Sequence, residues 1–300
     1  MKTSWLLLII LLNAHDADAQ ILPDHDPIDI LIVSDEVNPH GLPDGDLMQP
    51  GDLSDLLSNT PSLHTSSVVE VSTNDLEQAT ALLNFHPFDE GRPDVLIYFA
   101  HRIPNNGNDA SGRQAVFVNA VEQFLQDGGG VIAFHHGLYL TAGKQGIQDL
   151  LGAEATGAVP WDTVNGQDVI FVGGDHFIGA HQINFSGVTT YSNPAHGVAA
   201  ANYPFFNNTP DERYPLMDFN NANNGCVLET LFESNYSDQG NQHLLGYTKQ
   251  CPDWQSKVVA YQPGEYQPHA TNGNNLQILL NAIYHVTDFR WDVIFASNMD

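Results

Sequence analysis

Positively charged residues are scarce in this sequence of 300 residues. Lys+Arg number 9 against Asp+Glu 36, which gives a formal net charge of -27 at pH 7. Proteins that bind nucleic acid or anionic membrane surfaces need clusters of Lys and Arg, so the composition argues against both classes of partner. Strong negative charge maintains solubility through self-repulsion and suits a saline or extracellular setting. A hydrophobic content of 42% is typical of a globular protein and excludes a wholly disordered chain.

Long hydrophobic runs are also missing. The run Trp5–Leu12 is far shorter than the roughly 20 apolar residues that a membrane-spanning helix needs, and no later stretch approaches that length. Lys2 stands before this run, and Ala17–Ala19 follows it with a small residue at each end. These features are typical of a secretory signal peptide. We therefore predict that residues 1–19 are removed before Gln20 and that the mature protein is secreted or periplasmic.

Cysteine is almost absent. Only Cys226 and Cys251 occur, so a metal site built from several cysteines is excluded. An exported chain meets an oxidising compartment, where a disulfide between the two would add about 3 kcal/mol of stability by constraining the unfolded chain. The alternative is a catalytic thiol. Neither cysteine lies between a predicted strand and a helix, so the sequence favours the disulfide.

Strand and helix patterns alternate through the first half of the chain. The apolar runs 28–34, 94–100 and 131–135 are typical of buried strands. Residues 111–127 carry apolar side chains at helical spacing, and the glycines that follow are typical of a helix end. Such alternation predicts an α/β fold with a parallel sheet covered on both faces. The other elements predicted here are a helix at 52–59, a strand at 67–71 and a helix at 74–83 capped by Asn74 and Glu77.

The second half of the chain has a different composition. From about 150 to 270 it is dense in Asn, Gly and Pro, and helical patterns disappear until the helix predicted at 274–286. Because that last helix can pack back on the sheet, we predict one domain at 28–287 with a loop-rich second half rather than two domains. A lead-in at 20–27 and a tail at 288–300 flank this domain. The short strand-like pieces of the second half are 169–172, 182–185 and 258–261.

Histidines stand at the ends of several predicted strands. His40 and His101 follow the first and third of them, and His135 and His136 end the fourth. In an open parallel sheet, ligands bind outside the carboxyl ends of the strands. Histidine exchanges protons near neutral pH and also ligates metals as neutral imidazole. We therefore expect a site at this edge, with His40, His101 and His135 holding a divalent ion such as Zn²⁺, or with His135 acting as an acid or base without a metal.

A resemblance to a known family begins at the fourth strand. The segment Gly128–Gly137 reads GGGVIAFHHG, and it resembles the ThuA-like (trehalose-utilisation) family, which has the fold of class I glutamine amidotransferases. This resemblance implies a flavodoxin-like three-layer α/β sandwich with a mainly parallel sheet. In that fold the strand leads into a sharp turn, the nucleophile elbow, which holds a Cys in true amidotransferases. His135 stands at that position, and the missing thiol excludes glutamine hydrolysis through a Cys intermediate.

Further segments extend the resemblance over nearly the whole mature chain, with two departures. The family usually has Gly-His-Asp after its late strand, whereas Glu265 stands here in place of the His. Asp175, His176 and His181 lie in a rearranged segment; they are a second candidate cluster, although a surface loop is the simpler interpretation. The matching segments are Leu150–Gly152, Asn193–Val198, Asp211–Tyr214 and Leu279–Ile283.

The resemblance implies a role in carbohydrate metabolism. We predict an exported enzyme that hydrolyses, eliminates or isomerises a disaccharide or keto sugar. The alternatives are a non-catalytic carbohydrate-binding protein and a zinc-dependent ester or amide hydrolase. Aromatic residues in the loop-rich half suit sugar binding. If the family resemblance did not place Asp211 and Glu212 in the cleft, two adjacent carboxylates would be interpreted as a solvated turn. The predicted catalytic residues are His135, Glu212 and Tyr214, and the predicted substrate-binding residues are His40, His101, His136, Asp211, His196 and Glu265.

Overall fold

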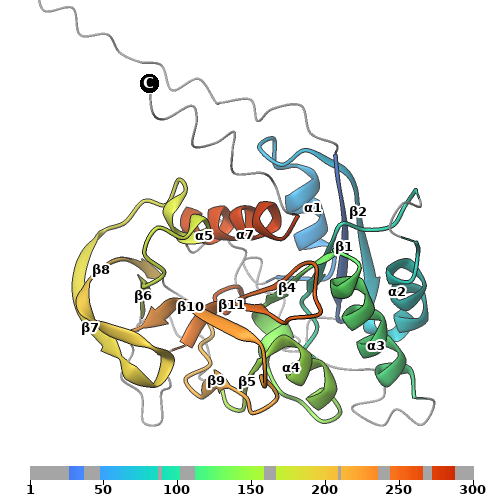
Figure 1. Cartoon of the computed structure of the whole chain (residues 1–300). Coiled ribbons are helices and arrows are strands. Elements are labelled where there is room, and N and C mark those ends of the chain that lie inside the picture. The colour runs from blue at the N-terminus through green and yellow to red at the C-terminus, as the bar shows by residue number, and fades with distance from the viewer. Residues whose placement is uncertain are drawn as a thin grey trace, which may run out of the picture. The chain divides into compact units, whose positions relative to one another are not determined.

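A mixed sheet of 10 strands runs through the described part of the chain (Figure 1). Its strand order is β2-β1-β3-β4-β12-β11-β10-β6-β8-β7, and a separate two-stranded sheet joins β5 and β9. The computed structural model describes residues 27–36, 48–86, 90–101, 112–158, 167–208, 211–235, 244–265 and 272–287.

The strands from β2 to β12 form the parallel half of the sheet, as the alternating pattern predicted. Their order is that of flavodoxin-like folds, with β12 in the place of the last strand. After β4 the chain leaves this half and returns only with β12, which pairs Val258 with Val131 of β4. The strands are β1 Ile28–Ser34, β2 Thr65–Ser72, β3 Val95–Tyr98, β4 Gly130–Phe134 and β12 Val258–Tyr261.

Helices cover both faces of the parallel half, which makes the three layers of the sandwich (Figure 1). On one face, apolar side chains of α2, α3 and α4 pack with alternate residues of the strands, such as Leu31 and Val33. On the other face α7 contacts β4 and β12, and its Tyr284 hydroxyl donates a hydrogen bond to the carbonyl of Ser62, just beyond α1. The helices are α1 Asp52–Ser58, α2 Leu76–Leu83, α3 Arg113–Gln126, α4 Gln145–Leu151, α5 Phe177–Ala180 and α7 Gly273–Val286.

The second half of the chain extends the sheet with antiparallel strands. Where the sequence predicted mainly loops, β11 pairs with β12 and is followed across the sheet by β10, β6, β8 and β7. The strand predicted at 182–185 is wrong, because these residues precede β7 without joining a strand. The strands are β5 Ala153–Ala155, β6 Gln167–Phe171, β7 Gly187–Asn193, β8 Val198–Asn208, β9 Met217–Phe219, β10 Val227–Ser234 and β11 Leu244–Gln250.

A disulfide joins Cys226 to Cys251. Cys226 directly precedes β10 and Cys251 directly follows β11, so the bond closes the open end of an antiparallel pair. The predicted disulfide is confirmed. The alternative of a free catalytic thiol is excluded, because both cysteines are in the disulfide.

The predicted cap of the second helix is wrong. The side chain of Ser72, not that of Asn74, accepts a hydrogen bond at this point, and it does so from the Asn74 N–H. A short 3₁₀ turn, Thr73–Asp75, then leads into α2 at Leu76. Ser72 caps this 3₁₀ turn and not α2, because the chain passes through the turn before it reaches the first residue of α2.

Several predictions concern residues outside those that the structure describes. They are the signal peptide at 1–19, most of the lead-in at 20–27, the tail at 288–300 and His40. Among the described helices, none has the length and apolar character needed to cross a membrane.

Candidate functional site

The turn after β4 carries two histidines in a strained conformation. His135 directly follows the strand and has a φ of 38°, which residues with a side chain rarely adopt. The turn continues as the 3₁₀ segment His135–Leu138, which approaches β3 closely. A Cβ on Gly137 would lie 2.1 Å from the carbonyl oxygen of Tyr98, so only glycine fits there. The sharp turn that the family resemblance implied is therefore present, and it projects His135 from the end of the strand.

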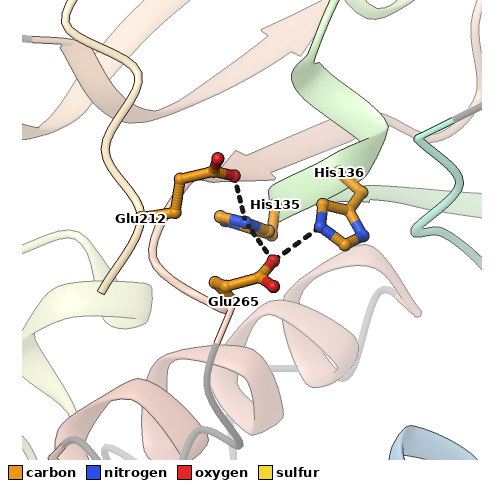
Figure 2. A group of neighbouring side chains, drawn as sticks. All are labelled: His135, His136, Glu212 and Glu265. Atoms are coloured by element: carbon orange, nitrogen blue, oxygen red, sulfur yellow. Dashed lines mark hydrogen bonds and ion pairs between the residues drawn. The ribbon is translucent and has the colours of Figure 1, made fainter. Parts of the chain in front are cut away.

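Both ring nitrogens of His135 have defined partners. Nδ1 lies 2.6 Å from the carbonyl oxygen of Gln262, so it must carry a proton and donate it. Nε2 lies 3.1 Å from Glu265 Oε2, 3.1 Å from the Tyr214 hydroxyl and 3.4 Å from Glu212 Oε2. Figure 2 shows the imidazole between the two carboxylates, which approach it from opposite sides. The three residues predicted to be catalytic are thus brought together, and Glu265 joins them.

His136 shares Glu265 with His135. Its Nε2 lies 2.6 Å from the same Oε2 atom, so one carboxylate oxygen contacts both imidazoles (Figure 2). The ring of His136 stacks on Phe99 at 4.9 Å between centroids and meets the edge of His101 at 5.4 Å. His101 is only partly buried, whereas His135 and His136 are fully buried.

Electrostatics divides the two histidines into different charge states. Burial disfavours the imidazolium of His135, but hydrogen bonds to Glu212 and Glu265 outweigh burial and raise the pKa of His135 to about 10. Burial, together with the charge on His135, lowers the pKa of His136. Burial raises the pKa of Glu265, but the two imidazoles outweigh it and hold that pKa well below its usual range. Near neutral pH the site therefore holds a protonated His135, a neutral His136 and an ionised Glu265.

Asp211 positions the two glutamates of the site. Its Oδ1 accepts hydrogen bonds from the backbone N–H groups of Glu212 and Glu265, both at 3.0 Å. Its Oδ2 accepts from Gly264 N and from Asn208 Nδ2, also at 3.0 Å. Burial raises the pKa of Asp211 to about 6. Both carboxylate oxygens accept hydrogen bonds from the protein, and the role of Asp211 in substrate binding stays a prediction.

The chemistry of the donor set fits a divalent metal ion. His135, His136, Glu212 and Glu265 each offer one ligand atom, and these atoms all lie within 4.8 Å of one another. Imidazole nitrogen with carboxylate oxygen is a donor set that Zn²⁺ accepts. The Nδ1–H of His135 bonds a backbone carbonyl, which is how metal-binding histidines are commonly oriented. Of the predicted metal ligands, His135 belongs to this group and His101 does not, while His40 lies outside the described residues.

His196 has a separate set of partners. Its Nδ1 lies 2.6 Å from Glu233 Oε1 and its Nε2 lies 2.9 Å from Asp218 Oδ1. Glu233 also accepts a hydrogen bond from the Tyr191 hydroxyl. In the described structure this network ties β7, β9 and β10 to the turn that holds His196, and its hydrogen bonds do not include the His135 cluster.

The second candidate cluster is divided between two environments. His176 caps the short helix α5 through Ile178 N, and its ring meets that of His285 at 4.6 Å. His181 instead stacks on Phe177 at 4.8 Å. Within the described residues, neither histidine belongs to a group of side chains that could hold a metal.

Sequence reasoning missed Gln262, whose backbone carbonyl accepts a hydrogen bond from His135 Nδ1. The Gln262 side chain also bonds Tyr214, because its Oε1 accepts from Tyr214 N at 3.2 Å. The only signal available was its position directly after a predicted strand.

A cavity of about 300 Å³ lies elsewhere, between α2, α3 and α4, and Tyr98 is among its lining residues.

Comparison with known proteins identifies the fold. No protein-family model and no curated protein matches the sequence. Among solved structures, one described as a ThuA-like protein from Bacteroides uniformis matches with a TM-score of 0.56 and 14% sequence identity, covering 88% of this chain and 95% of that chain. A glutamine amidotransferase from Thermotoga maritima matches with a TM-score of 0.41 and 10% identity, over 92% of this chain and 87% of that one. A beta-galactosidase from Bacillus circulans matches with a TM-score of 0.38 and 10% identity, over 72% of this chain and 24% of that one. The chain therefore has the α/β fold of the ThuA-like structure, as its sequence predicted.

Proposed function

We propose that this protein is an exported enzyme of carbohydrate metabolism that moves protons through His135. The observation that carries the proposal is the arrangement around the His135 imidazole. Nδ1 is held by the Gln262 carbonyl, while Nε2 faces two carboxylates and a phenol within 3.4 Å. A buried imidazole of fixed orientation between acidic groups is suited to give and take a proton.

Each side chain of the cluster has a chemical role in this proposal. Protonated His135 donates a proton from Nε2 to an oxygen of the substrate. Glu212, on the opposite side of the imidazole from Glu265, accepts a proton from the substrate. Burial raises the pKa of Tyr214 well above its usual range, so its hydroxyl keeps its proton and donates a hydrogen bond. Glu265 holds both imidazoles in place through one oxygen. These roles fit hydrolysis, elimination or isomerisation of a disaccharide or keto sugar.

The substrate class draws on the resemblance of the sequence to the ThuA-like family. The surroundings of the cluster are compatible with a sugar. His101 and Tyr139 are partly buried and stack on each other at 5.0 Å, next to the enclosed His136 and Tyr214. Aromatic faces beside hydrogen-bonding groups suit the mixed apolar and polar surface of a carbohydrate.

A second candidate function, a zinc-dependent ester or amide hydrolase, is favoured by the four-residue donor group. His135, His136, Glu212 and Glu265 would hold the ion. A bound divalent ion would supply Lewis-acid polarisation of a carbonyl and would lower the pKa of a bound water. Tyr214 would then orient the substrate. Asp211 would hold Glu212 and Glu265 next to each other by accepting hydrogen bonds from their backbone N–H groups.

Metal analysis followed by turnover assays tests both candidates. The mature protein is purified without chelator or nickel, analysed for divalent metals, and incubated in D₂O with disaccharides and keto sugars while product and deuterium incorporation are followed by NMR. We expect His135→Ala to abolish turnover, whereas His176→Ala, which removes a partly buried histidine outside the cluster, should retain it. Stoichiometric metal that is lost in His135→Ala would favour the zinc hydrolase. Sugar binding without turnover in the wild type would instead identify a non-catalytic carbohydrate-binding protein.

Export is part of the same proposal. The disulfide between Cys226 and Cys251 supports it, because such bonds persist in oxidising compartments. Expression with the native N-terminus followed by N-terminal sequencing should find Gln20 as the first residue of protein outside the cytoplasm. Retention of Met1 in all of the folded protein would contradict export through this signal.

A further inference from the structure

Lys144 is a lysine with no solvent exposure, and it lies directly before α4. Its Nζ donates hydrogen bonds to carbonyl oxygens rather than to any carboxylate. The acceptors are the carbonyls of Tyr139 at 2.7 Å, Ala100 at 2.8 Å and His136 at 2.9 Å, with that of Gly137 at 3.4 Å. An ammonium has three N–H donors, so the three shortest contacts use all of them.

These carbonyls belong to two segments that the site requires. His136, Gly137 and Tyr139 belong to the turn that follows β4, and Ala100 follows β3. Gln148, one turn into α4, reinforces the arrangement because its Nε2 donates to the Gly137 carbonyl at 2.7 Å. One cation and one amide from the start of α4 therefore hold the turn against the neighbouring strand.

An ammonium group needs a specific reason to be buried. Removing a charge from water is strongly unfavourable unless hydrogen bonds replace the solvent. Burial lowers the pKa of Lys144 to about 7, while three carbonyl acceptors match the ammonium and not the amine. The same carbonyls would be buried without donors if the side chain were apolar, which would release the turn from a conformation in which His135 has a φ of 38°.

We propose that Lys144 is a positioning residue for the site: it holds the carbonyls of the turn after β4 and thereby fixes the imidazole of His135 against Gln262 and Glu265. This inference rests on the proposed function only in taking His135 as the reactive group. The geometry that it explains, the His135 orientation, can be measured whether or not a substrate is known.

Lys249 provides a matched control. It is also buried, and its Nζ donates to the carbonyls of Asp149 and Leu150 at 3.1 Å and 2.9 Å. These carbonyls lie at the opposite end of α4 from Lys144. A loss of stability common to both lysine variants therefore reports on α4, while an effect on His135 that only the Lys144 variant shows reports on positioning.

The experiment is ¹⁵N NMR of the histidine rings in the full mature protein at about pH 6, below the pKa of about 7 to which burial lowers Lys144. We expect Lys144→Met to shift or broaden the His135 Nδ1 and Nε2 signals, and Lys249→Met to leave them at their wild-type positions. If Lys144→Met does not fold, Gln148→Met removes a single bond to the same turn and should shift the same signals by a smaller amount. Unchanged His135 signals in the folded Lys144 variant, or in the Gln148 variant where it is used, would overturn the proposal.

A turnover assay, once a substrate is found, adds an independent readout. Misplacing a reacting group by about 1 Å lowers turnover about 100-fold, so Lys144→Met should lower kcat to that extent with little change in KM. Lys249→Met should keep kcat near the wild-type value. Loss of kcat in both variants to the same degree would indicate a structural role. A wild-type protein without any turnover would refute the proposed function but not the NMR result.

Discussion

Replacing Asp211 by asparagine is the sharpest test of how the site is held together. The substitution keeps the size and shape of the side chain and exchanges one acceptor oxygen for an NH₂ donor. In the wild type, one oxygen accepts from Glu212 N and Glu265 N, and the other from Gly264 N and Asn208 Nδ2. In Asp211→Asn, two of these four donors must face another donor, whichever way the amide is turned.

The expected loss follows from these contacts. A buried donor left without an acceptor costs about 1–3 kcal/mol, so two of them cost about 2–6 kcal/mol. Part of this is offset, because burial raises the pKa of Asp211 to about 6 and a neutral amide removes the unfavourable buried charge. Asn208 cannot compensate by turning over, since its Oδ1 already accepts from Asn275 at 2.8 Å. We therefore expect the lower part of the range, about 2–4 kcal/mol.

The measurement is urea unfolding followed by tryptophan fluorescence, with Asp168→Asn as the control. Asp168 is more exposed than Asp211, and its carboxylate accepts from the Asn235 side chain at the surface. The control should change the unfolding free energy by less than about 0.5 kcal/mol. In Asp211→Asn, the NMR signals of His135 should also move, because either the Glu265 N–H or the adjacent Gly264 N–H loses its acceptor, depending on how the amide is turned. If both variants unfold at the same urea concentration, Asp211 does not hold the two glutamates as described.

Three further predictions follow from other parts of the structure. Gly137→Ala places a methyl group 2.1 Å from the Tyr98 carbonyl oxygen, so we expect several kcal/mol of destabilisation or failure to fold, and an unaltered melting temperature would contradict the described turn. Replacing Cys226 and Cys251 together by serine should lower the unfolding free energy by about 3 kcal/mol, and an equal unfolding midpoint for the variant and the oxidised wild type would exclude this contribution. The pKa of His196 is raised, because its two carboxylate partners outweigh burial. Its stabilising contribution is then complete below pH 6.5 and is lost as pH rises through the raised pKa, so the stability difference between wild type and His196→Gln should shrink as pH rises from 6.5 through that pKa. A difference that grows with pH would reverse this assignment.

The parallel half of the fold could be predicted because its strands, apart from the edge strand β2, are buried on both faces. Runs such as Ile28–Ser34 and Val258–Tyr261 are almost continuously apolar and were located to the residue. The antiparallel extension carries no comparable pattern. In β7, Gly187–Asn193, residues alternate between exposed and partly buried, and the polar side chains there hide a strand among loop-like residues.

The candidate site could be predicted only where a side chain would itself carry out the proposed chemistry. His135, Glu212 and Tyr214 meet as expected, since a reactive side chain at a strand end is visible in sequence and the family resemblance placed the others. Gln262 contacts His135 through its backbone carbonyl, 127 residues away along the chain. Lys144 donates to backbone carbonyls as well, including that of Ala100, 44 residues away. Every residue has a carbonyl, so nothing in the order of residue types marks which one will accept such a bond.

The late return of the chain to β12 has a consequence for biosynthesis. His135 and the carbonyl that orients it are 127 residues apart, and β12 pairs with β4 only after the antiparallel strands have been made. Contacts of such separation form slowly, because the intervening chain must be ordered before they become favourable. A chain synthesised only as far as β11 would contain both histidines and Glu212 but neither Glu265 nor the anchor of the imidazole. The cluster around His135 therefore cannot be complete until the chain has been made as far as Glu265.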